Sequence, residues 1–173
     1  MPKAKLGIGP VIQDGFYYDF KLPRALTPDD LKELETTMRS FIAQNLSFSG
    51  KRITPAEGRK IFENQPFKLE LIKDFVKEKK TLNIYITGNL PKKTNSKNLP
   101  DSKFYILNSL FVDLCRGGHV KNTRLISPDA FTLTHIAGAY WRGNEKYPML
   151  TRIYGLSFNS KTELDAHLNL IEE

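Results

Sequence analysis

Near the start of the chain, apolar and polar positions alternate in the pattern of a β-strand. In the segment GFYYDF, Phe16, Tyr18 and Phe20 stand at every second position. A period of two is typical of a strand with one buried face. The preceding dipeptide Asp14-Gly15 is a turn signal, so the sequence predicts a β-hairpin at this point.

The pattern changes to helical spacing over TPDDLKELETTMRSFIAQN, residues 27–45. Thr27 is a typical N-cap, Pro28 suits the first helical position, and Asp30 places negative charge in the first turn. Apolar residues follow at steps of three and four, and predict an amphipathic helix whose apolar stripe faces a sheet or another helix. These residues are Leu31, Leu34, Met38, Phe41 and Ile42.

Two further segments carry the capping-box pattern, in which a hydroxyl caps the helix and a glutamate three residues later reaches back. Thr54 with Glu57, and Ser160 with Glu163, therefore predict two helix starts. The second start leads into an apolar pattern that predicts a closing helix. Because a lone helical histidine seldom binds a ligand, we interpret His167 in this helix as a surface or core residue.

Four later segments are rich in β-branched and aromatic residues and predict strands. Between the first two lies GNLPKKTNSKNLPDSK, which predicts a long solvated loop because it offers almost nothing to bury. Helices gather early and strands late, and each needs the other to cover its apolar face. We therefore expect an α+β fold, a mostly antiparallel sheet with helices packed on one face, in a single domain over residues 1–173. The strand segments are TLNIYITG, KFYILNSLFVDL, AFTLTHIAGAYW and MLTRIYGLSF.

Length and composition narrow the class of protein. A chain of 173 residues with 40% hydrophobic content is long enough for one compact core. It has one cysteine, hence no internal disulfide, and neither a membrane-spanning run nor a signal peptide, so we expect a cytoplasmic protein without membrane contact. The net charge of +7 favours a polyanionic partner such as RNA.

The segment FVDLCRGGHV holds the single cysteine, Cys115, four residues before His119 and two after Asp113. Thiolate and imidazole are preferred zinc ligands, and the two glycines between them allow the chain to turn. Zinc needs three or four protein ligands, so the pair would form an incomplete metal site without His135 or a carboxylate. The alternatives are a thiol nucleophile with its base, and a small buried cysteine at a strand end.

Two basic segments are candidates for RNA contact. Arg116 stands beside Gly117 and Gly118, where a phosphate or ribose could approach the backbone. In AYWRGNEKYPMLTRIYG, aromatic residues are interleaved with Arg142 and Arg152, a composition that suits stacking on an unpaired base with phosphate contacts. The alternative is a strand that turns at Gly143 with its aromatic rings in the core.

The strings LGIGPVIQDGFYYDF, FVDLCRGGHV and AGAYWRGNEKYPMLTRIYG together resemble the amino-terminal editing domain of threonyl-tRNA synthetases, which is related to the editing domain of alanyl-tRNA synthetases. The resemblance spans nearly the whole chain. It implies hydrolysis of tRNA(Thr) wrongly charged with serine, and as partners the tRNA(Thr) acceptor end and the catalytic and anticodon-binding domains of an ATP-dependent ligase. This chain itself carries no ATP-binding motif.

The resemblance also implies which residues form the editing site. By motif match these are Asp113, Cys115, His119, Tyr18 of GFYYD and Lys68 of FKLELI. The family also uses a His-x-x-x-His pair on an upstream helix, whereas this sequence has no histidine before His119. We therefore expect a fragment that lacks this helix, weakly active or inactive alone, with zinc at most at an incomplete site. A natural remnant, a non-catalytic module that binds the acceptor end, and a stand-alone cysteine hydrolase are the alternatives.

Overall fold

The computed structural model describes residues 3–89 and 110–172. The chain divides into two compact units, which we describe separately: unit 1 is Met1–Gln44 with Ile126–Glu173, and unit 2 is Asn45–Leu125. Most of the predicted loop in GNLPKKTNSKNLPDSK, and the first part of the predicted strand KFYILNSLFVDL, lie outside the described residues.

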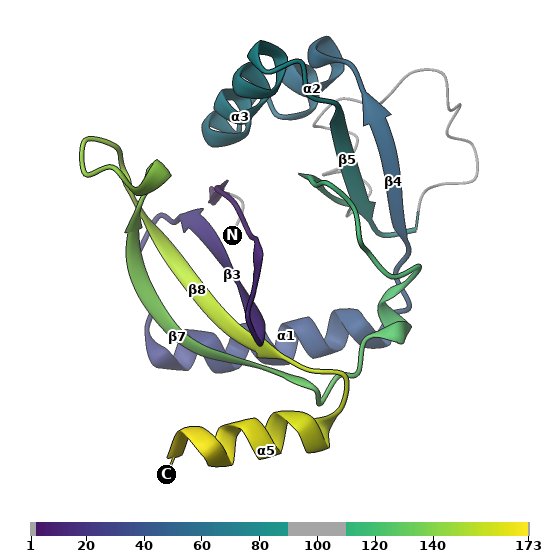
Figure 1. Cartoon of the computed structure of the whole chain (residues 1–173), viewed down its shortest axis with the longest axis vertical. Helices are drawn as coiled ribbons and strands as arrows, with labels where there is room; N and C mark the ends of the chain where they lie inside the picture. The colour runs from purple at the N-terminus through teal and green to yellow at the C-terminus, as the bar shows by residue number, and fades with distance from the viewer. Residues whose placement is uncertain (1–2, 90–109, 173) are drawn as a thin grey trace. The chain divides into compact units, whose positions relative to one another are not determined.

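Unit 1 is built on an antiparallel sheet with the strand order β1-β3-β8-β7, to which β2 adds by pairing with β3 (Figure 1). The predicted hairpin is confirmed, since Val11 of β2 pairs with Phe16 of β3 and Asp14 in the turn has a φ of 61°. The strands are β1 (Lys5–Leu6), β2 (Val11–Ile12), β3 (Gly15–Lys21), β7 (Phe131–Tyr140) and β8 (Met149–Ser157).

Helix α1 (Pro28–Ala43) confirms the first predicted helix. The Asp30 carboxylate accepts from the backbone N–H of Thr27 at 2.7 Å. The helix is joined to β7 through Glu35, whose carboxylate accepts from the Leu133 N–H at 2.7 Å. The apolar stripe is only partly covered, because Leu31 is buried whereas Phe41 is 49% exposed.

Helix α5 (Lys161–Glu172) confirms the predicted closing helix. The Ser160 hydroxyl accepts from the Glu163 N–H at 3.2 Å, and the Glu163 carboxylate reaches back to the N–H of Asn159. The ring of His167 packs 5.0 Å from that of Phe158, as a packing histidine should.

The described residues of unit 2 form a second antiparallel sheet, in the order β4-β5-β6, together with the α-helices α2 and α3. The Thr54 capping box opens α2 as predicted, with the Glu57 carboxylate accepting from the Thr54 N–H at 2.6 Å. The elements are β4 (Phe48–Ile53), α2 (Pro55–Ile61), α3 (Pro66–Lys77), β5 (Leu82–Thr87) and β6 (Phe111–Leu114). The core is formed by Ile53, Ile61, Phe62, Ile72, Leu82, Ile84, Ile86 and Leu110.

The predicted α+β class with antiparallel strands is confirmed, and the strands are shared between two sheets. None of the helices in the described part of the chain combines the length and the hydrophobicity that a membrane span requires.

Candidate functional site

The segment that follows β6 brings Cys115 and His119 together. The backbone N–H of Cys115 donates to the carbonyl of Asn83 at 3.2 Å, so the chain keeps its contact with β5 for one residue beyond the strand. Gly117 and Gly118 then adopt φ angles of 116° and 87°, a region that favours glycine. The resulting turn returns the His119 Nδ1 to 3.9 Å from the Cys115 Sγ.

A buried ion pair joins this segment to helix α3. The Lys68 Nζ lies 2.5 Å from the Asp113 Oδ1, and the Lys68 side chain is only 2% exposed. A buried ammonium is tolerated only when a charge or hydrogen bonds compensate for lost hydration, and Asp113 supplies that compensation. The same Asp113 oxygen accepts from the Leu114 N–H at 2.8 Å, which fixes the carboxylate.

Two aromatic rings hold the imidazole of His119. It stacks on Tyr85 of β5 with the ring centroids 4.0 Å apart, and it lies 5.4 Å from the tilted ring of Phe48. His119 is still exposed in part, but the shielding of its ring by these neighbours lowers its pKa. The negative charge of Asp113 raises the pKa by a smaller amount, so the pKa of His119 lies below its ordinary value. The ring is therefore neutral at pH 7 and able to accept a proton.

Four of the five residues implied by the resemblance thus lie in unit 2, and Asp113 links them. It pairs with Lys68 at the end of β6, and the turn that follows brings His119 to face Cys115. The fifth residue, Tyr18, lies on β3 of unit 1. Its ring stacks on Phe20 at 4.6 Å.

Gly9 lies directly against the Tyr18 ring. A β-carbon placed on Gly9 would fall 2.1 Å from that ring, so this position requires glycine. Gly9, the second glycine in the string LGIGPVIQDGFYYDF, therefore has a packing role beside Tyr18.

The described residues do not complete a zinc site. Among them, no group of three or more His, Cys, Asp or Glu side chains is arranged to hold a metal ion. Cys115 and His119 supply two ligands, while the Asp113 carboxylate is paired with Lys68. His135, considered above as a further ligand, lies in unit 1 and stacks on Tyr154 at 4.3 Å. The donor set fits zinc poorly.

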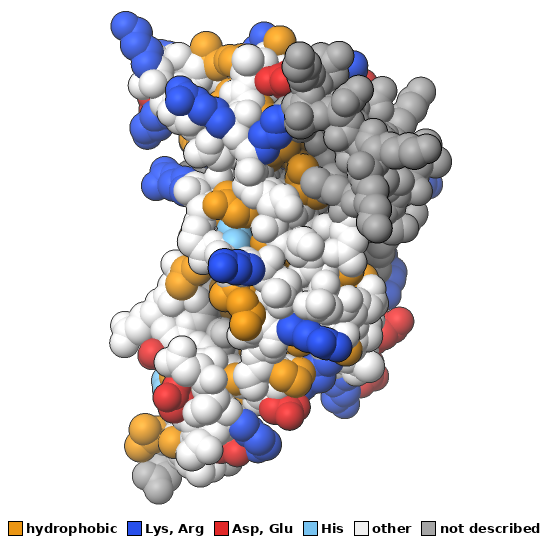
Figure 2. All heavy atoms as spheres, turned by 90° about the vertical axis from the view of Figure 1, so that its right-hand side faces the viewer, with side chains coloured by type: hydrophobic (Ala, Val, Ile, Leu, Met, Phe, Trp, Pro, Cys, Tyr) orange, Lys and Arg blue, Asp and Glu red, His pale blue; other side chains and the backbone are white. Residues whose placement is uncertain are grey.

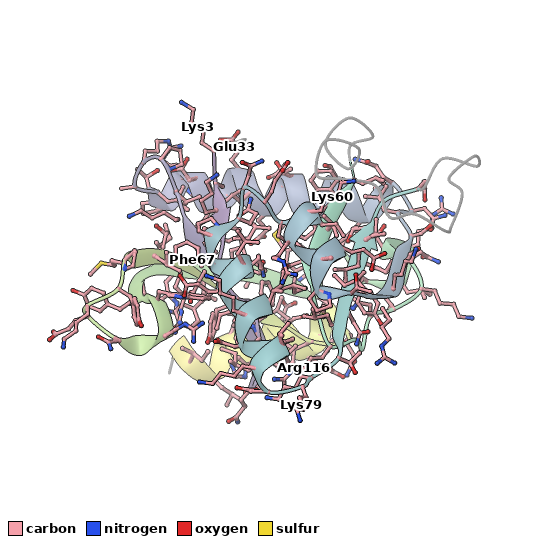
Figure 3. The ribbon with its side chains drawn as sticks, turned by 90° about the horizontal axis from the view of Figure 1, so that it is seen from above. Lys3, Glu33, Lys60, Phe67, Lys79 and Arg116 are labelled. Atoms are coloured by element: carbon pink, nitrogen blue, oxygen red, sulfur yellow. The ribbon has the colours of Figure 1, made fainter. Side chains whose placement is uncertain are left out.

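Lys and Arg side chains stand apart from one another on the face drawn in Figure 2, rather than in one continuous patch. The exposed Arg116 follows β6 (Figure 3). Arg142 is also exposed, in a turn where its φ is 58°. Arg152 differs, because its guanidinium donates to both oxygens of the buried Asp19 at 2.7 and 2.9 Å.

The aromatic rings near Arg142 divide into core and surface. Trp141 is 2% exposed, so the core interpretation holds for this ring and it cannot stack on a base. Tyr140 and Tyr147 are exposed, on either side of the turn between β7 and β8.

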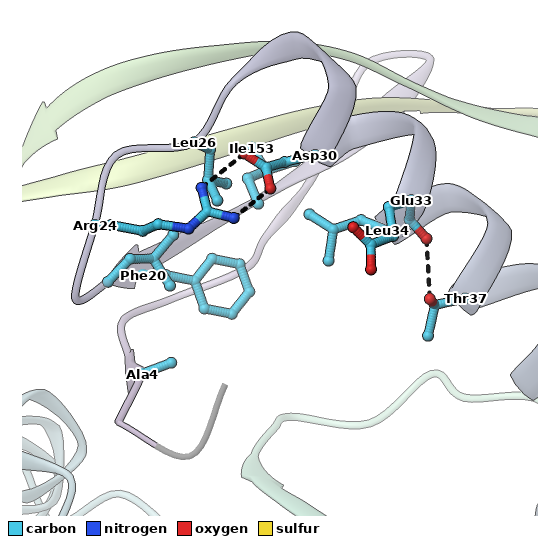
Figure 4. A pocket seen from close by; sticks show the side chains of 10 residues that line it. Ala4, Phe20, Arg24, Leu26, Asp30, Glu33, Leu34, Thr37 and Ile153 are labelled. Carbon is cyan, nitrogen blue, oxygen red and sulfur yellow. Dashed lines mark hydrogen bonds and ion pairs between the residues drawn. The ribbon is translucent and has the colours of Figure 1, made fainter.

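Two features of the structure were not predicted from the sequence. The first is a pair of aromatic rings, Phe48 and Tyr85, that pack against His119. Strand β4, which carries Phe48, was also not predicted. The second is a cavity of about 360 Å³ in unit 1, where the Arg24 guanidinium is paired with Asp30 and lowers the pKa of that carboxyl (Figure 4). Its lining is otherwise mainly apolar and contains none of the residues that the resemblance implies.

Comparison with known proteins gives one consistent result. Residues 101–154 match the family described as the threonyl and alanyl tRNA synthetase second additional domain. Threonine–tRNA ligase from Dehalococcoides mccartyi is 49% identical over 172 residues, which is 99% of this chain and 25% of the relative. The corresponding ligase from Borreliella burgdorferi is 44% identical over 172 residues, 99% of the chain and 26% of the relative.

The resemblance inferred from the motifs is therefore confirmed along nearly the whole chain. The chain spans about a quarter of the length of these curated relatives.

Proposed function

We propose that this chain is the editing domain of a threonyl-tRNA synthetase and that the site in unit 2 hydrolyses the ester of tRNA(Thr) wrongly charged with serine. The observation that carries the proposal is the arrangement around Asp113. Its ion pair with Lys68 at 2.5 Å lies beside a neutral His119 that faces Cys115, in a chain 49% identical to a threonine–tRNA ligase.

Such an editing site answers a physical limit on substrate selection. Serine lacks the methyl group of threonine, and a binding pocket gains only about 1–3 kcal/mol from one such group. This difference is too small for accurate translation. A second pocket that accepts seryl-tRNA(Thr) and excludes the larger threonyl ester removes the error.

The geometry supports a role for each of the four site residues in unit 2. A water molecule attacks the carbonyl carbon of the ester while the neutral His119 ring accepts its proton. The bond from that carbon to the ribose oxygen then breaks, and the leaving oxygen takes the proton back from His119 to become a hydroxyl. Lys68 and Asp113 are positioning residues that fix the strand end, and Cys115 contacts the imidazole. Tyr18 is assigned by resemblance alone.

We further propose that the chain binds the acceptor end of tRNA(Thr) and works beside the catalytic and anticodon-binding domains of its parent ligase in the cytoplasm. The net charge of +7 and the exposed side chains of Arg116 and Arg142 support contact with phosphate. Arg152 contributes to tRNA binding only indirectly, because its guanidinium is already hydrogen-bonded to both carboxylate oxygens of Asp19.

A second candidate is a module that binds the acceptor end without chemistry. It is favoured by one sequence fact: the three histidines are residues 119, 135 and 167, so the family's His-x-x-x-His pair is not among them. General acid-base assistance is typically worth ~10²–10⁴-fold, and its partial loss would make the isolated chain slow or inactive.

One experiment separates the two candidates. Release of serine from preformed seryl-tRNA(Thr) is measured for the 173-residue chain and for the same chain extended by the His-x-x-x-His segment of a relative, with threonyl-tRNA(Thr) as the spared substrate. The editing proposal predicts that the extension restores hydrolysis of the serine ester alone. An extended chain that binds tRNA but releases no serine would leave only the binding module.

A further inference from the structure

One face of the unit 1 sheet carries a row of planar side chains that the editing site does not use. The row begins at His135 on β7, continues through Tyr154 on β8 and Tyr17 on β3, and ends at Arg152. These three strands lie side by side (Figure 1), and their pairing places His135 and Tyr17 on either side of Tyr154.

The rings contact one another in sequence. His135 is stacked on Tyr154, with centroids 4.3 Å apart and an angle of 13° between the planes. Tyr154 lies 5.6 Å from the tilted ring of Tyr17. The Arg152 guanidinium lies 3.8 Å from the centroid of Tyr17 and so places a cation against the far end of the row.

Both ends of the row are held in place. Arg152 is fixed by its two bonds to Asp19, which is 3% exposed. At the other end, the Thr134 hydroxyl is 3.0 Å from the Nδ1 of His135 and orients the imidazole. The surface is therefore rigid before any partner arrives, which reduces the entropy lost on binding.

Sheet stability does not account for the whole row. Cross-strand aromatic pairs stabilise sheets, and this explains the half-buried Tyr17 and Tyr154. His135 is different, because its side chain is exposed while its ring lies parallel to Tyr154. An exposed, oriented ring at the end of a stack offers a surface on which another planar group can stack.

We propose that the His135–Tyr154–Tyr17 row is a stacking surface for an unpaired nucleobase of tRNA, with the base lying on His135. The choice of tRNA as the partner rests on the proposed function. Every base has a face that stacks on an aromatic ring, and proteins commonly hold unpaired RNA ends in this way. Lys21 lies two residues beyond Asp19 on β3, is exposed, and supplies a cation on the same side of the strand for the adjoining phosphate.

The test uses an RNA hairpin that mimics an acceptor stem, with an unpaired 3′ tail or with a blunt end. Fluorescence anisotropy at low salt gives the affinity of the chain for each RNA. Base–aromatic stacking predicts that the tail strengthens binding by about 5- to 100-fold. His135→Ala removes this preference, and His135→Phe retains it because the ring remains.

His167→Ala is the matched control, since His167 also packs on an aromatic ring but lies on α5. It leaves the preference for the tail unchanged. As a measurement that needs no variant, 2-aminopurine in the tail is quenched on binding, because the fluorescent base stacks.

The outcomes separate the two proposals. If the chain binds both hairpins equally, or if His135→Ala keeps the full preference for the tail, the stacking surface is wrong while RNA binding stands. If the chain binds neither RNA at low salt, both the RNA partner and the stacking surface are rejected.

Discussion

The Lys68 ammonium lies 2.5 Å from the Asp113 carboxylate and so joins helix α3 to strand β6. Lys68 is 2% exposed at its side chain and Asp113 is 16% exposed, which places the pair out of reach of most solvent. Removing one partner of such a pair leaves an uncompensated buried charge, whereas removing both does not. The pair therefore matters for the stability of unit 2.

Lys68→Met is expected to lower the free energy of unfolding by ~3 kcal/mol, because the largely buried Asp113 carboxylate loses the ammonium that balances its charge. Urea denaturation measures the loss. The double variant Lys68→Met with Asp113→Leu should recover most of it. Lys161→Met is the control, since its pair with Asp165 is exposed on α5 and contributes little. Equal losses in the single and double variants would contradict the account.

The lowered pKa of His119 predicts how stability depends on pH. The folded state prefers the neutral ring, so below the ordinary value of 6.5 the unfolded chain binds more protons than the folded one. Above pH 6.5 the contribution of His119 to the free energy of unfolding is therefore complete. It is lost as the pH falls from 6.5 towards and through the lower pKa of the folded state.

Comparison with His119→Phe isolates this effect, because phenylalanine keeps an aromatic ring beside Tyr85 and does not titrate. The free energy of unfolding is measured for both proteins at pH 5 and pH 8. The wild-type chain should lose more stability than the variant between pH 8 and pH 5. If both proteins lose the same stability between pH 8 and pH 5, or if the variant loses more, the lowered pKa of His119 is refuted.

Arg142 and Arg152 are predicted to behave differently when each is replaced by alanine. Arg152→Ala leaves the buried Asp19 without its bidentate partner and should lower the free energy of unfolding by ~3 kcal/mol. Arg142→Ala should cost less stability than Arg152→Ala, because Arg142 is exposed and covers the Trp141 ring at 5.6 Å. It should weaken RNA binding and reduce the dependence of log affinity on log salt by about 1. Thermal melts measure the effect on stability, and salt titrations measure the effect on RNA binding. An RNA-binding defect in Arg152→Ala alone would mean that Arg152, and not Arg142, contacts RNA.

Zinc is predicted to add little to stability. Cys115 and His119 are two ligands, and structural zinc contributes strongly only when its coordination is complete. Thermal melts with added zinc and with chelator should give the same midpoint for the wild-type chain. A midpoint several degrees lower in chelator, absent in Cys115→Ser, would show that a further side chain completes the site.

The periodic segments of the sequence were sufficient to predict most helices and strands. The β2–β3 hairpin, α1, α2 and α5 follow from local turn and capping chemistry, which acts over a few residues. Strand β4 was missed because FSGKRI carries glycine and two charged residues, and its strand state depends on pairing with β5.

The candidate site was predictable only in part. Cys115 and His119 are close in sequence, so their contact follows from a local turn at two glycines. The family resemblance named Lys68 and Asp113 as site residues, but their ion pair joins separate elements and was not predicted. The role of Arg152 was obscured for a similar reason, because its partner Asp19 lies on another strand.

The most direct test of the proposed editing site places this chain within a complete ligase. The corresponding quarter of the Dehalococcoides mccartyi threonine–tRNA ligase is replaced by this sequence, and serine release from preformed seryl-tRNA(Thr) is measured. We expect the chimera to release serine and to spare threonyl-tRNA(Thr). His119→Ala should slow serine release by ~10²–10⁴-fold, while His167→Ala leaves the rate unchanged. A chimera that releases serine equally fast with and without His119 would contradict the proposed site.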